Sequence, residues 1–419
     1  MNKRKLHILI FCILVLLLAI GCSSTDKGQD SVDDILPDPK DRRNKENDES
    51  PANEIDPIRE QVKGMSIEEK IGQMFMVGLE GYNIDDNSRI MINEHHIGGF
   101  IIFGKNVENS SQLLNLINSL KEANSQNNKI PLFISIDEEG GRVSRMPAEI
   151  KKFPTSGKIG QMNDKELSYN IGTILGKELK MFGFNMNFAP VLDINSNPQN
   201  PVIGDRAFGT EPGIVSELGI QTMKGIQSEG IISVVKHFPG HGDTSVDSHI
   251  GLPTIEYDLQ RIKEFELVPF REAIENGADV VMVAHILLNQ IDPDYPSSLS
   301  NIVITDILRK DLGFDGVVIS DDMTMGAITE NYEVKDAAIK SINAGSDIVL
   351  IAHGFDNSIA AINSIKEAVR DGIISEERID ESVYRILKLK KKYNITDDIN
   401  NSIDVEDINN KIDEVLEKF

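Results

Sequence analysis

The stretch Gly-Val-Val-Ile-Ser-Asp at residues 316–321 is a short apolar run, rich in β-branched residues, that ends in a carboxylate. Such a run is typical of a strand that is buried on both faces of a parallel sheet. Seven similar runs occur after Met65, and amphipathic segments separate them. The eight runs are Gln73–Gly78, Gly98–Phe103, Leu132–Asp137, Asn185–Asp193, Ser233–His237, Asp279–His285, Gly316–Asp321 and Asp347–His353.

The segments between these runs have the apolar spacing of helices. The clearest of them are Ser111–Ala123, Asp164–Phe182, Gly213–Glu229, Asp258–Asn276 and Asp336–Ala344. Eight strands that alternate with helices predict an α/β fold, a (β/α)8 TIM barrel that forms a single catalytic domain. A doubly wound open sheet is the alternative that periodicity alone leaves open.

The N-terminus has the pattern of an export signal. Lys3–Lys5 precede the apolar run Ile8–Ile20, which is short for a membrane span, and Gly-Cys follows. This pattern resembles the lipobox of bacterial lipoproteins, with Ala19 where Leu is usual. It predicts a signal peptide over residues 1–21 and lipidation of Cys22, which would anchor the protein to the outer face of the bacterial cell membrane. An uncleaved anchor helix is the alternative.

The rest of the chain divides by composition. Residues 22–57 are polar and rich in Asp, Asn, Ser and Pro, which predicts a disordered tether. Residues 58–394 hold the barrel, and residues 395–419 are expected to form a connector and a C-terminal helix. The formal charge of -24 makes nucleic acid an improbable partner. The only cysteines, Cys12 and Cys22, fall in the signal region, so no disulfide is expected.

Ionisable residues recur where the predicted strands end. In a barrel of parallel strands all of these ends lie at one face, and the active sites of this fold lie at that face. The third to eighth runs end in, or next to, Asp137, Asp193, Lys236-His237, His285, Asp321-Asp322 and His353. The sequence therefore predicts one polar site at the C-terminal end of the barrel.

The densest cluster is Lys-His-Phe-Pro-Gly-His-Gly-Asp-Thr-Ser-Val-Asp-Ser-His at residues 236–249, which holds three of the eight histidines. A metal site is one interpretation, because His237 and His241 are four residues apart. However, the Pro-Gly between them excludes the helix that would align the pair. Acid/base catalysis is the other interpretation, since Asp247 can orient the ring of His249 and raise its basicity.

Three further segments supply carboxylates and guanidinium groups. Asp137 begins Asp-Glu-Glu-Gly-Gly-Arg-Val-Ser-Arg, and such groups bind sugar hydroxyls through directed hydrogen bonds. The long loop 197–209 contains Arg206, for which a loop-bracing ion pair is the alternative. Asp321 follows a β-branched strand that aims it rigidly, as a nucleophile requires. Together with Asp322, it could instead bind a divalent ion.

These segments together resemble the bacterial β-N-acetylglucosaminidase (β-hexosaminidase) branch of glycoside hydrolase family 3. Lys-His-Phe-Pro-Gly-His-Gly followed by Asp-Ser-His is similar to a motif of that branch, and the resemblance covers about Ile58 to Lys392. It implies Asp321 as nucleophile and His249 as acid/base, with Asp247 as its partner. The positions that hold the N-acetylglucosamine ring would be Asp137, Arg145, Arg206, Lys236 and His237.

The resemblance implies a retaining exo-β-N-acetylglucosaminidase that needs no cofactor or metal. Muropeptides are the first expected substrate and chitooligosaccharides the second. Transfer to phosphate, or sugar binding without catalysis by a lipoprotein, are the alternatives. The chain contains no Trp, so aromatic stacking on the sugar would need Phe or Tyr, such as Phe208 or Phe238.

Two departures from the family pattern stand out. The usual Asp-Gln-Glu-Gly-Gly has Glu138 in place of Gln, which adds a charge near the site and could alter its pH dependence. The chain also ends soon after the barrel, so the second domain of larger members is not expected. His285 matches the end of the family's sixth strand, without an assigned role.

Overall fold

The computed structural model describes residues 56–419. The predicted signal peptide, Cys22 and nearly all of the predicted tether therefore lie outside the described residues. Within residues 56–419, no helix combines the length and the apolar character that crossing a membrane would require.

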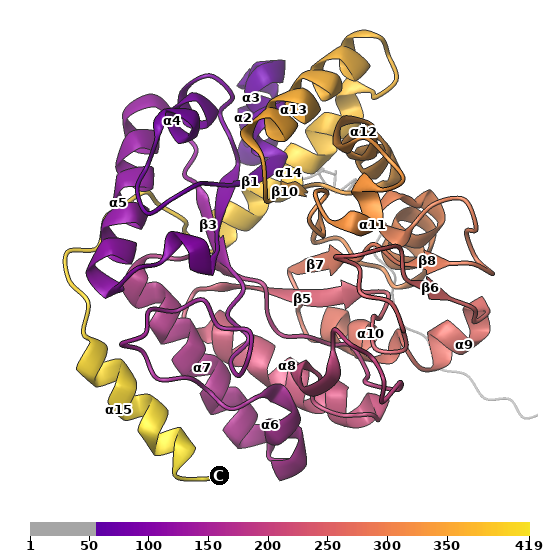
Figure 1. Cartoon of the computed structure of the whole chain (residues 1–419). Helices are drawn as coiled ribbons and strands as arrows, with labels where there is room; N and C mark the ends of the chain where they lie inside the picture. Colours follow the sequence, from indigo (N-terminus) through magenta and orange to yellow (C-terminus); the bar gives the residue numbers. More distant parts are fainter. Residues whose placement is uncertain (1–55) are drawn as a thin grey trace, which may run out of the picture. The chain divides into compact units, whose positions relative to one another are not determined.

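Eight parallel strands form a barrel, as the sequence predicts (Figure 1). Their order is β10-β1-β2-β3-β4-β5-β7-β9. The ring closes between β9 and β10, where Ile319 bridges Ile348 and the Ser320 N–H donates to the Ile348 carbonyl at 3.0 Å. The barrel strands are β1 Phe75–Gly78, β2 Gly99–Ile102, β3 Phe133–Ile136, β4 Met186–Asn187, β5 Ile232–Phe238, β7 Val280–Val283, β9 Val317–Ser320 and β10 Val349–Ile351.

Helices surround the barrel on its outer side, and four of the five predicted helical segments form single helices (Figure 1). Two further strands, β6 Thr254–Ile255 and β8 Leu287–Leu288, pair in parallel beside it. The helices that follow or precede the barrel strands are α3 Ile67–Gln73, α4 Asp86–Asn93, α5 Ser110–Asn127, α6 Ser156–Met162, α7 Lys165–Phe182, α8 Pro212–Ser228, α9 Leu259–Glu264, α10 Val268–Glu275, a π-helix Ile302–Asp311, α11 Gly326–Thr329, α12 Val334–Ala344, α13 Phe355–Arg370 and α14 Glu376–Lys392.

Two predicted boundaries are wrong, and a proline explains each. The segment predicted as one helix from Asp258 to Asn276 forms α9 and α10, because Pro269 has no N–H and its ring would clash with the carbonyl of Phe265. The run Asn185–Asp193 forms only the short β4, since Pro190 cannot donate to the ladder. Beyond β4, Val191 makes a single bridge to Lys236.

The N-terminal end of the barrel is covered by α14. Its buried Lys390 donates to the Gln73 side chain at 2.7 Å and to the Gly98 and Pro131 carbonyls at 3.1 and 2.7 Å. These acceptors precede β1, β2 and β3, so one ammonium group joins three strand starts. The C-terminal end of the barrel is thus the open one.

Two helices lie at the ends of the described chain. α2 (Pro57–Gly64) packs against α14, and its N-cap Asp56 accepts the Tyr384 hydroxyl at 2.8 Å. α15 (Val405–Leu416) packs on α7 and buries Ile408, Ile412 and Val415. The expected C-terminal helix is therefore present on the outside of the barrel (Figure 1), and its Asn409 contacts Glu149 and Lys151 of the loop that follows β3.

Candidate active site

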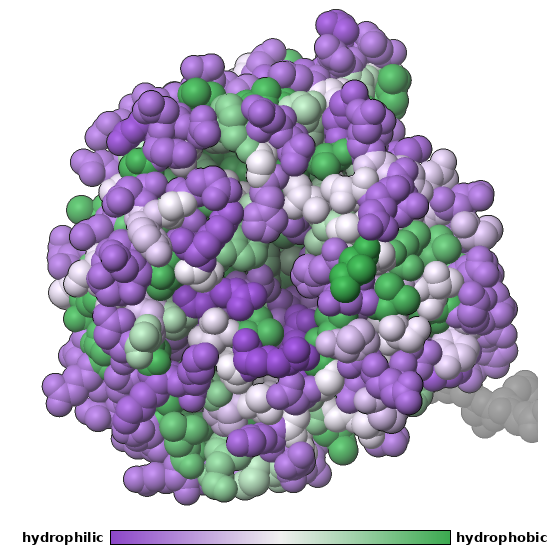
Figure 2. Space-filling model, in the orientation of Figure 1, coloured by the Kyte–Doolittle hydropathy of each residue, from purple (hydrophilic) through white to green (hydrophobic). Residues whose placement is uncertain are grey.

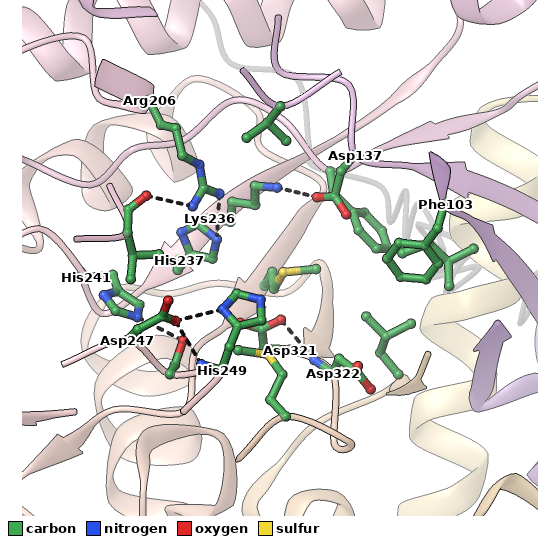
Figure 3. A pocket seen from close by; sticks show the side chains of 18 of the residues that line it. Phe103, Asp137, Arg206, Lys236, His237, His241, Asp247, His249, Asp321 and Asp322 are labelled. Carbon is green, nitrogen blue, oxygen red and sulfur yellow. Dashed lines mark hydrogen bonds and ion pairs between the residues drawn. The ribbon is translucent and has the colours of Figure 1, made fainter. Parts of the chain in front are cut away.

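A pocket of about 430 Å³ lies at the C-terminal end of the barrel. Figure 2 shows it as a hollow near the middle of the molecular face, with hydrophilic residues at its wall. Every residue that the sequence predicts for catalysis or sugar binding lines this one pocket (Figure 3). These residues are Asp137, Arg145, Arg206, Lys236, His237, Asp247, His249 and Asp321.

Asp321 is fixed at the carboxyl end of β9. Its N–H donates to the Val283 carbonyl of the neighbouring strand at 2.9 Å, and its Oδ1 accepts the Asp322 N–H at 2.9 Å. Burial alone would raise the pKa of Asp321, but the charges of His285 and His237 and the Asp322 N–H lower it below the usual value. Asp321 is therefore an ionised, rigidly held carboxylate at the pocket floor.

Asp322 and His285 support this strand end rather than open into a ligand set. Asp322 accepts the N–H groups of Thr324 and Ala352 at 2.9 and 2.8 Å and the Thr324 hydroxyl at 2.6 Å. His285 contacts the Asp322 carbonyl at 2.9 Å and the Ser298 hydroxyl at 2.6 Å. The Asp322 carboxylate is thus occupied by hydrogen bonds from Thr324 and Ala352. This arrangement disfavours a divalent ion bound by Asp321 and Asp322 together. Among residues 56–419, no group of three or more His, Cys, Asp or Glu side chains is arranged to hold a metal.

His249 and Asp247 form a pair at the rim of the pocket. His249 Nδ1 lies 2.7 Å from Asp247 Oδ1, and this oxygen also accepts the His249 N–H at 2.9 Å. Burial would raise the pKa of Asp247, but these two hydrogen bonds from His249 lower it overall. An ionised Asp247 fixes the ring with Nδ1 as donor, so Nε2 is free to exchange a proton with a ligand.

The loop that contains this pair is anchored on two sides. His241 holds the Ser248 hydroxyl at 3.2 Å and the Thr244 hydroxyl at 2.7 Å, and burial lowers its pKa to about 4. On the other side, the Ala327 N–H of α11 donates to the Ser248 carbonyl at 3.0 Å. Gly326 permits this approach, since a Cβ there would lie 2.6 Å from the His249 carbonyl oxygen.

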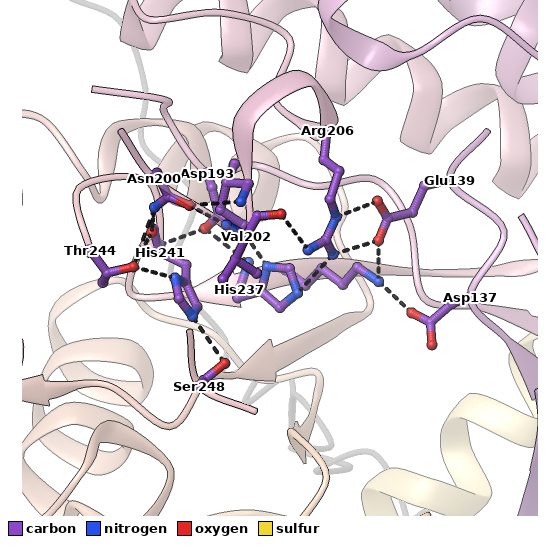
Figure 4. A network of polar contacts seen from close by, with 12 residues as sticks. Asp137, Glu139, Asp193, Asn200, Val202, Arg206, His237, His241, Thr244 and Ser248 are labelled. Carbon is purple, nitrogen blue, oxygen red and sulfur yellow. Dashed lines mark hydrogen bonds and ion pairs between the residues drawn. The ribbon is translucent and has the colours of Figure 1, made fainter. Parts of the chain in front are cut away.

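The opposite wall is a buried network of alternating charges (Figure 4). Lys236 Nζ contacts Asp137 at 2.5 Å and Glu139 at 2.7 Å. Arg206 binds the two carboxylate oxygens of Glu139 at 2.7 and 2.8 Å. Burial would raise the pKa of Glu139, but Arg206 and Lys236 hold it far below its usual value. Arg206 therefore braces its loop through Glu139 and also lines the pocket.

Glu139 is a site residue that the sequence interpretation missed. Its signal was weak, because it lies in a run of acidic residues, and its partner Arg206 is 67 positions away. The partner of His237 was also missed: Asp193 contacts His237 Nδ1 at 2.6 Å and accepts the N–H groups of His237 and His241 at 3.2 and 2.7 Å. Asp193 thus orients two of the three histidines of the segment.

The aromatic wall differs from the prediction. Phe208 and Phe238 are 3% and 0% exposed, and neither lines the pocket. Phe103 lines it instead and stacks on His353, with ring centroids 5.3 Å apart and an interplanar angle of 30°. Phe188 also lines the pocket but is 1% exposed, so Phe103, which follows β2, is the ring more open to stacking on a sugar.

A barrel whose open end joins an ionised, buried carboxylate to an imidazole–carboxylate pair in one polar pocket has the site of a glycoside hydrolase. The comparison with known proteins shows the family of glycoside hydrolases to which the chain belongs. The chain belongs to glycosyl hydrolase family 3, because the profile of that family's N-terminal domain matches residues 66–389.

Several relatives are named for one activity. The chain is 37% identical over 325 residues to β-hexosaminidase A of Pseudoalteromonas piscicida, covering 72% of this chain but 54% of that one. It is 34% identical to a β-hexosaminidase of Nitrosomonas eutropha, covering 75% of this chain and 91% of that one. A family 3 β-N-acetylglucosaminidase structure from Paenibacillus sp. str. FPU-7 superposes with a TM-score of 0.80 at 40% identity, covering 84% and 69% of the two chains.

Proposed function

We propose that this chain is a retaining exo-β-N-acetylglucosaminidase that removes terminal N-acetylglucosamine by double displacement. The observation that carries the proposal is that Asp321 and the Asp247–His249 pair line the same pocket (Figure 3). The names of the relatives support the same activity. A binding protein would need neither an aimed carboxylate nor a side chain able to move a proton.

In the first step, Asp321 attacks the anomeric carbon and the bond to the leaving group breaks. His249 Nε2–H gives its proton to the departing oxygen, so the leaving sugar departs as a neutral alcohol. Asp247 stabilises the imidazolium before the transfer, because its pKa is low and it remains an anion.

In the second step, His249 is neutral and accepts a proton from water, whose oxygen attacks the anomeric carbon. The bond to Asp321 breaks, and the product keeps the β-configuration because two inversions cancel. Lys236, Arg206, Arg145 and Asp137 would hold the sugar hydroxyls during both steps, since their polar groups line the wall opposite His249.

For the substrate we propose GlcNAc–MurNAc muropeptides first and chitooligosaccharides second. This choice rests on the N-terminal sequence, which predicts export and lipid anchoring through Cys22. Metabolic labelling with a palmitate analogue tests the anchor: the wild-type chain should be labelled and fractionate with membranes, and Cys22→Ala should not be labelled.

Turnover of 4-nitrophenyl N-acetyl-β-glucosaminide tests the reaction itself. Asp321→Asn should abolish nitrophenol release while binding of N-acetylglucosamine remains measurable by calorimetry. His249→Ala should slow cleavage of a disaccharide far more than cleavage of the nitrophenyl glycoside, because nitrophenolate leaves without a proton. Equal losses on the two substrates would refute His249 as the acid.

The identity of the product tests substrate and mechanism together. Purified muropeptides are incubated with enzyme, with and without phosphate, and the products are resolved by mass spectrometry. We expect free N-acetylglucosamine in both reactions, and proton NMR should show the β-anomer first. The appearance of a sugar phosphate would refute hydrolysis as the main reaction.

A further inference from the structure

Two stacked rings, which we call the end wall, form one side of the pocket. Phe103 follows β2 and His353 follows β10, and both line the pocket. Their ring centroids are 5.3 Å apart, and the interplanar angle is 30°. β1 lies between these two strands and ends at Gly78, where a Cβ would lie 2.0 Å from the Ala352 carbonyl oxygen. Because Gly78 has no Cβ, β10 lies close against β1, and the two rings meet across its end.

A buried amide side chain fixes the backbone of Phe103. Asn106 is 0% exposed, and its Oδ1 accepts the Phe103 N–H at 3.0 Å. Its Nδ2 donates to the carbonyls of Leu79 and Gly81 at 3.0 and 2.9 Å. Asn106 thus uses its acceptor and both its donors to join the turn after β2 to the loop after β1. The fold therefore sets the position of Phe103 before any ligand binds.

The outer edge of His353 contacts the same two segments. Lys105 Nζ lies 3.4 Å from His353 Nδ1 and 2.8 Å from Glu80 Oε1. Lys105 and Glu80 are 37% and 66% exposed, so their ion pair adds little to stability. It nevertheless links the loop after β1, the turn after β2 and the end of β10. The end wall is therefore built from three neighbouring segments that contact one another.

The end wall lies across the pocket from the acid/base pair. In Figure 3, Phe103 and Asp137 lie on one side of the pocket, and Asp247 and His249 lie on the other. Phe103 is also close to a sugar-binding candidate, because a Cβ at the next residue, Gly104, would lie 3.8 Å from Arg145 Cδ.

The two sides of the pocket face opposite ends of a bound sugar. In the proposed reaction C1 lies at Asp321, and the oxygen that leaves C1 lies at His249. C4 is across the pyranose ring from C1, so the C4 hydroxyl group points away from His249 and toward the end wall. A second sugar joined through O4 would need the space that the rings of Phe103 and His353 occupy.

We propose that the end wall restricts the enzyme to terminal sugars. The rings of Phe103 and His353 exclude any residue joined to O4 of the sugar in the pocket, so one N-acetylglucosamine is removed at a time from the non-reducing end. Both residues determine specificity by exclusion and take no part in bond breaking. The inference rests on the proposed function for the direction of the sugar, but exclusion at O4 can be measured without turnover.

Four variants separate the bulk of the rings from other effects. Phe103→Ala and His353→Ala each remove one ring, and His353 is exposed, so its variant keeps the test valid if Phe103→Ala does not fold. His353→Phe keeps a ring but removes the imidazole nitrogens. Tyr82→Ala is the matched control, because Tyr82 is an aromatic residue of the loop after β1 that is 44% exposed and does not line the pocket.

The first measurement identifies the initial products from 4-nitrophenyl N,N′-diacetyl-β-chitobioside by mass spectrometry. Wild type, His353→Phe and Tyr82→Ala should release N-acetylglucosamine and leave the nitrophenyl monosaccharide. Phe103→Ala and His353→Ala should also release chitobiose and nitrophenol. The share of chitobiose among the initial products should rise about ten-fold, the lower end of the discrimination that a pocket achieves by shape.

The second measurement needs no catalysis. Calorimetry gives the Kd for N-acetylglucosamine and for its 4-O-methyl ether, the smallest extension at O4. The ether should bind wild type about ten-fold more weakly than the parent sugar, and this ratio should narrow in both alanine variants. Methylation removes the same O–H donor for every variant, so a change in the ratio reports on the space at O4.

Each result supports or overturns the end wall. Unchanged products and an unchanged Kd ratio in the folded alanine variants would overturn it and leave the proposed function intact. A narrowed Kd ratio without turnover by any variant, wild type included, would support the end wall and refute the proposed function. Chitobiose release by His353→Phe equal to that of His353→Ala would overturn exclusion by ring bulk. If wild type binds neither sugar, both proposals fail.

Discussion

The ion pairs of Glu139 with Arg206 and Lys236 should affect both the stability of the protein and its binding of the sugar. Glu139→Gln keeps the shape of the side chain but removes its charge. Arg206 and Lys236 are 12% and 2% exposed, so both would remain in an interior that compensates them poorly. Gln can still accept one hydrogen bond from Arg206, and Asp137 still neutralises Lys236 at 2.5 Å.

The expected loss of stability in Glu139→Gln depends on the contacts that Arg206 and Lys236 keep. Removing one partner of a buried ion pair costs about 3–5 kcal/mol. Because Asp137 and one amide oxygen are retained, we expect the lower end of that range, about 3 kcal/mol. Each kcal/mol lowers the Tm of a domain of this size by about 2 °C, so the Tm should fall by about 6 °C.

The pH dependence of this loss has a definite sign. Since Arg206 and Lys236 hold the pKa of Glu139 far below 4.5, its contribution is present above pH 4.5 and is lost as the pH falls through the lowered value. The difference in Tm between wild type and Glu139→Gln should therefore be constant near neutral pH and should shrink in strong acid.

The assay is calorimetric melting at pH 7 together with the KM for 4-nitrophenyl N-acetyl-β-glucosaminide. Asp205→Asn is the matched control: it breaks the Arg142–Asp205 pair, whose side chains are 48% and 51% exposed, and should cost about 0–1 kcal/mol. KM should rise more than kcat falls, because the cations that lose position are those proposed to hold the sugar in its ground state. On the scale of about 2 °C per kcal/mol, the Tm of Glu139→Gln should lie well below that of Asp205→Asn. Tm values within about 1 °C of each other would refute the electrostatic argument.

Three other predictions follow from the catalytic loop and pocket. Asp247→Asn should lower kcat by about 10²-fold or more on poor leaving groups, because His249 loses its orienting anion; an unchanged kcat on a disaccharide would contradict this. Gly326→Ala should lower both kcat and the Tm, since the new Cβ would lie 2.6 Å from the His249 carbonyl oxygen and displace that backbone, whereas Gly64→Ala, where a Cβ meets nothing within 4 Å, should change neither. Prolonged treatment with a chelator should leave nitrophenol release unchanged, and a loss that zinc restores would favour the metal interpretation.

The fold was predictable because each barrel strand is a separate signal. An apolar, β-branched run such as 316–321 is recognisable without knowing its neighbours, and parallel strands place all their ends at one face. The two wrong boundaries occurred where a proline interrupted the backbone hydrogen bonds although the apolar pattern continued. Pro190 ended a strand that the apolar run continued, and Pro269 divided a helix whose periodicity looks unbroken.

The residues that line the pocket were predictable from the sequence, but the residues that hold them in place were not. Asp321 and His249 stand out by position and residue type. Glu139 does not, and Asp193 stands out only as a strand end, because the roles of both depend on Arg206 and His237, which are 67 and 44 positions distant in the chain. The aromatic wall failed for the same reason: the sequence offers many phenylalanines, and only the fold determines which ring faces the pocket.

Three carboxyl groups near this pocket show why residue type alone cannot fix the chemistry. Burial raises the pKa of Glu138, Glu139 and Asp321 alike, and neighbours then decide the outcome. Arg206 and Lys236 lower the pKa of Glu139, and histidines and a backbone N–H lower the pKa of Asp321, whereas burial, with a smaller effect of the Glu139 charge, keeps the pKa of Glu138 high. Adjacent residues of one strand end therefore differ in protonation below about pH 7: Glu139 is an anion that holds Arg206 and Lys236, whereas Glu138 keeps its proton and accepts the Arg145 N–H. The partners of each side chain separate these two roles, because Glu139 contacts the pocket-lining Arg206 and Lys236, whereas Glu138 is 1% exposed and makes no such ion pair within residues 56–419.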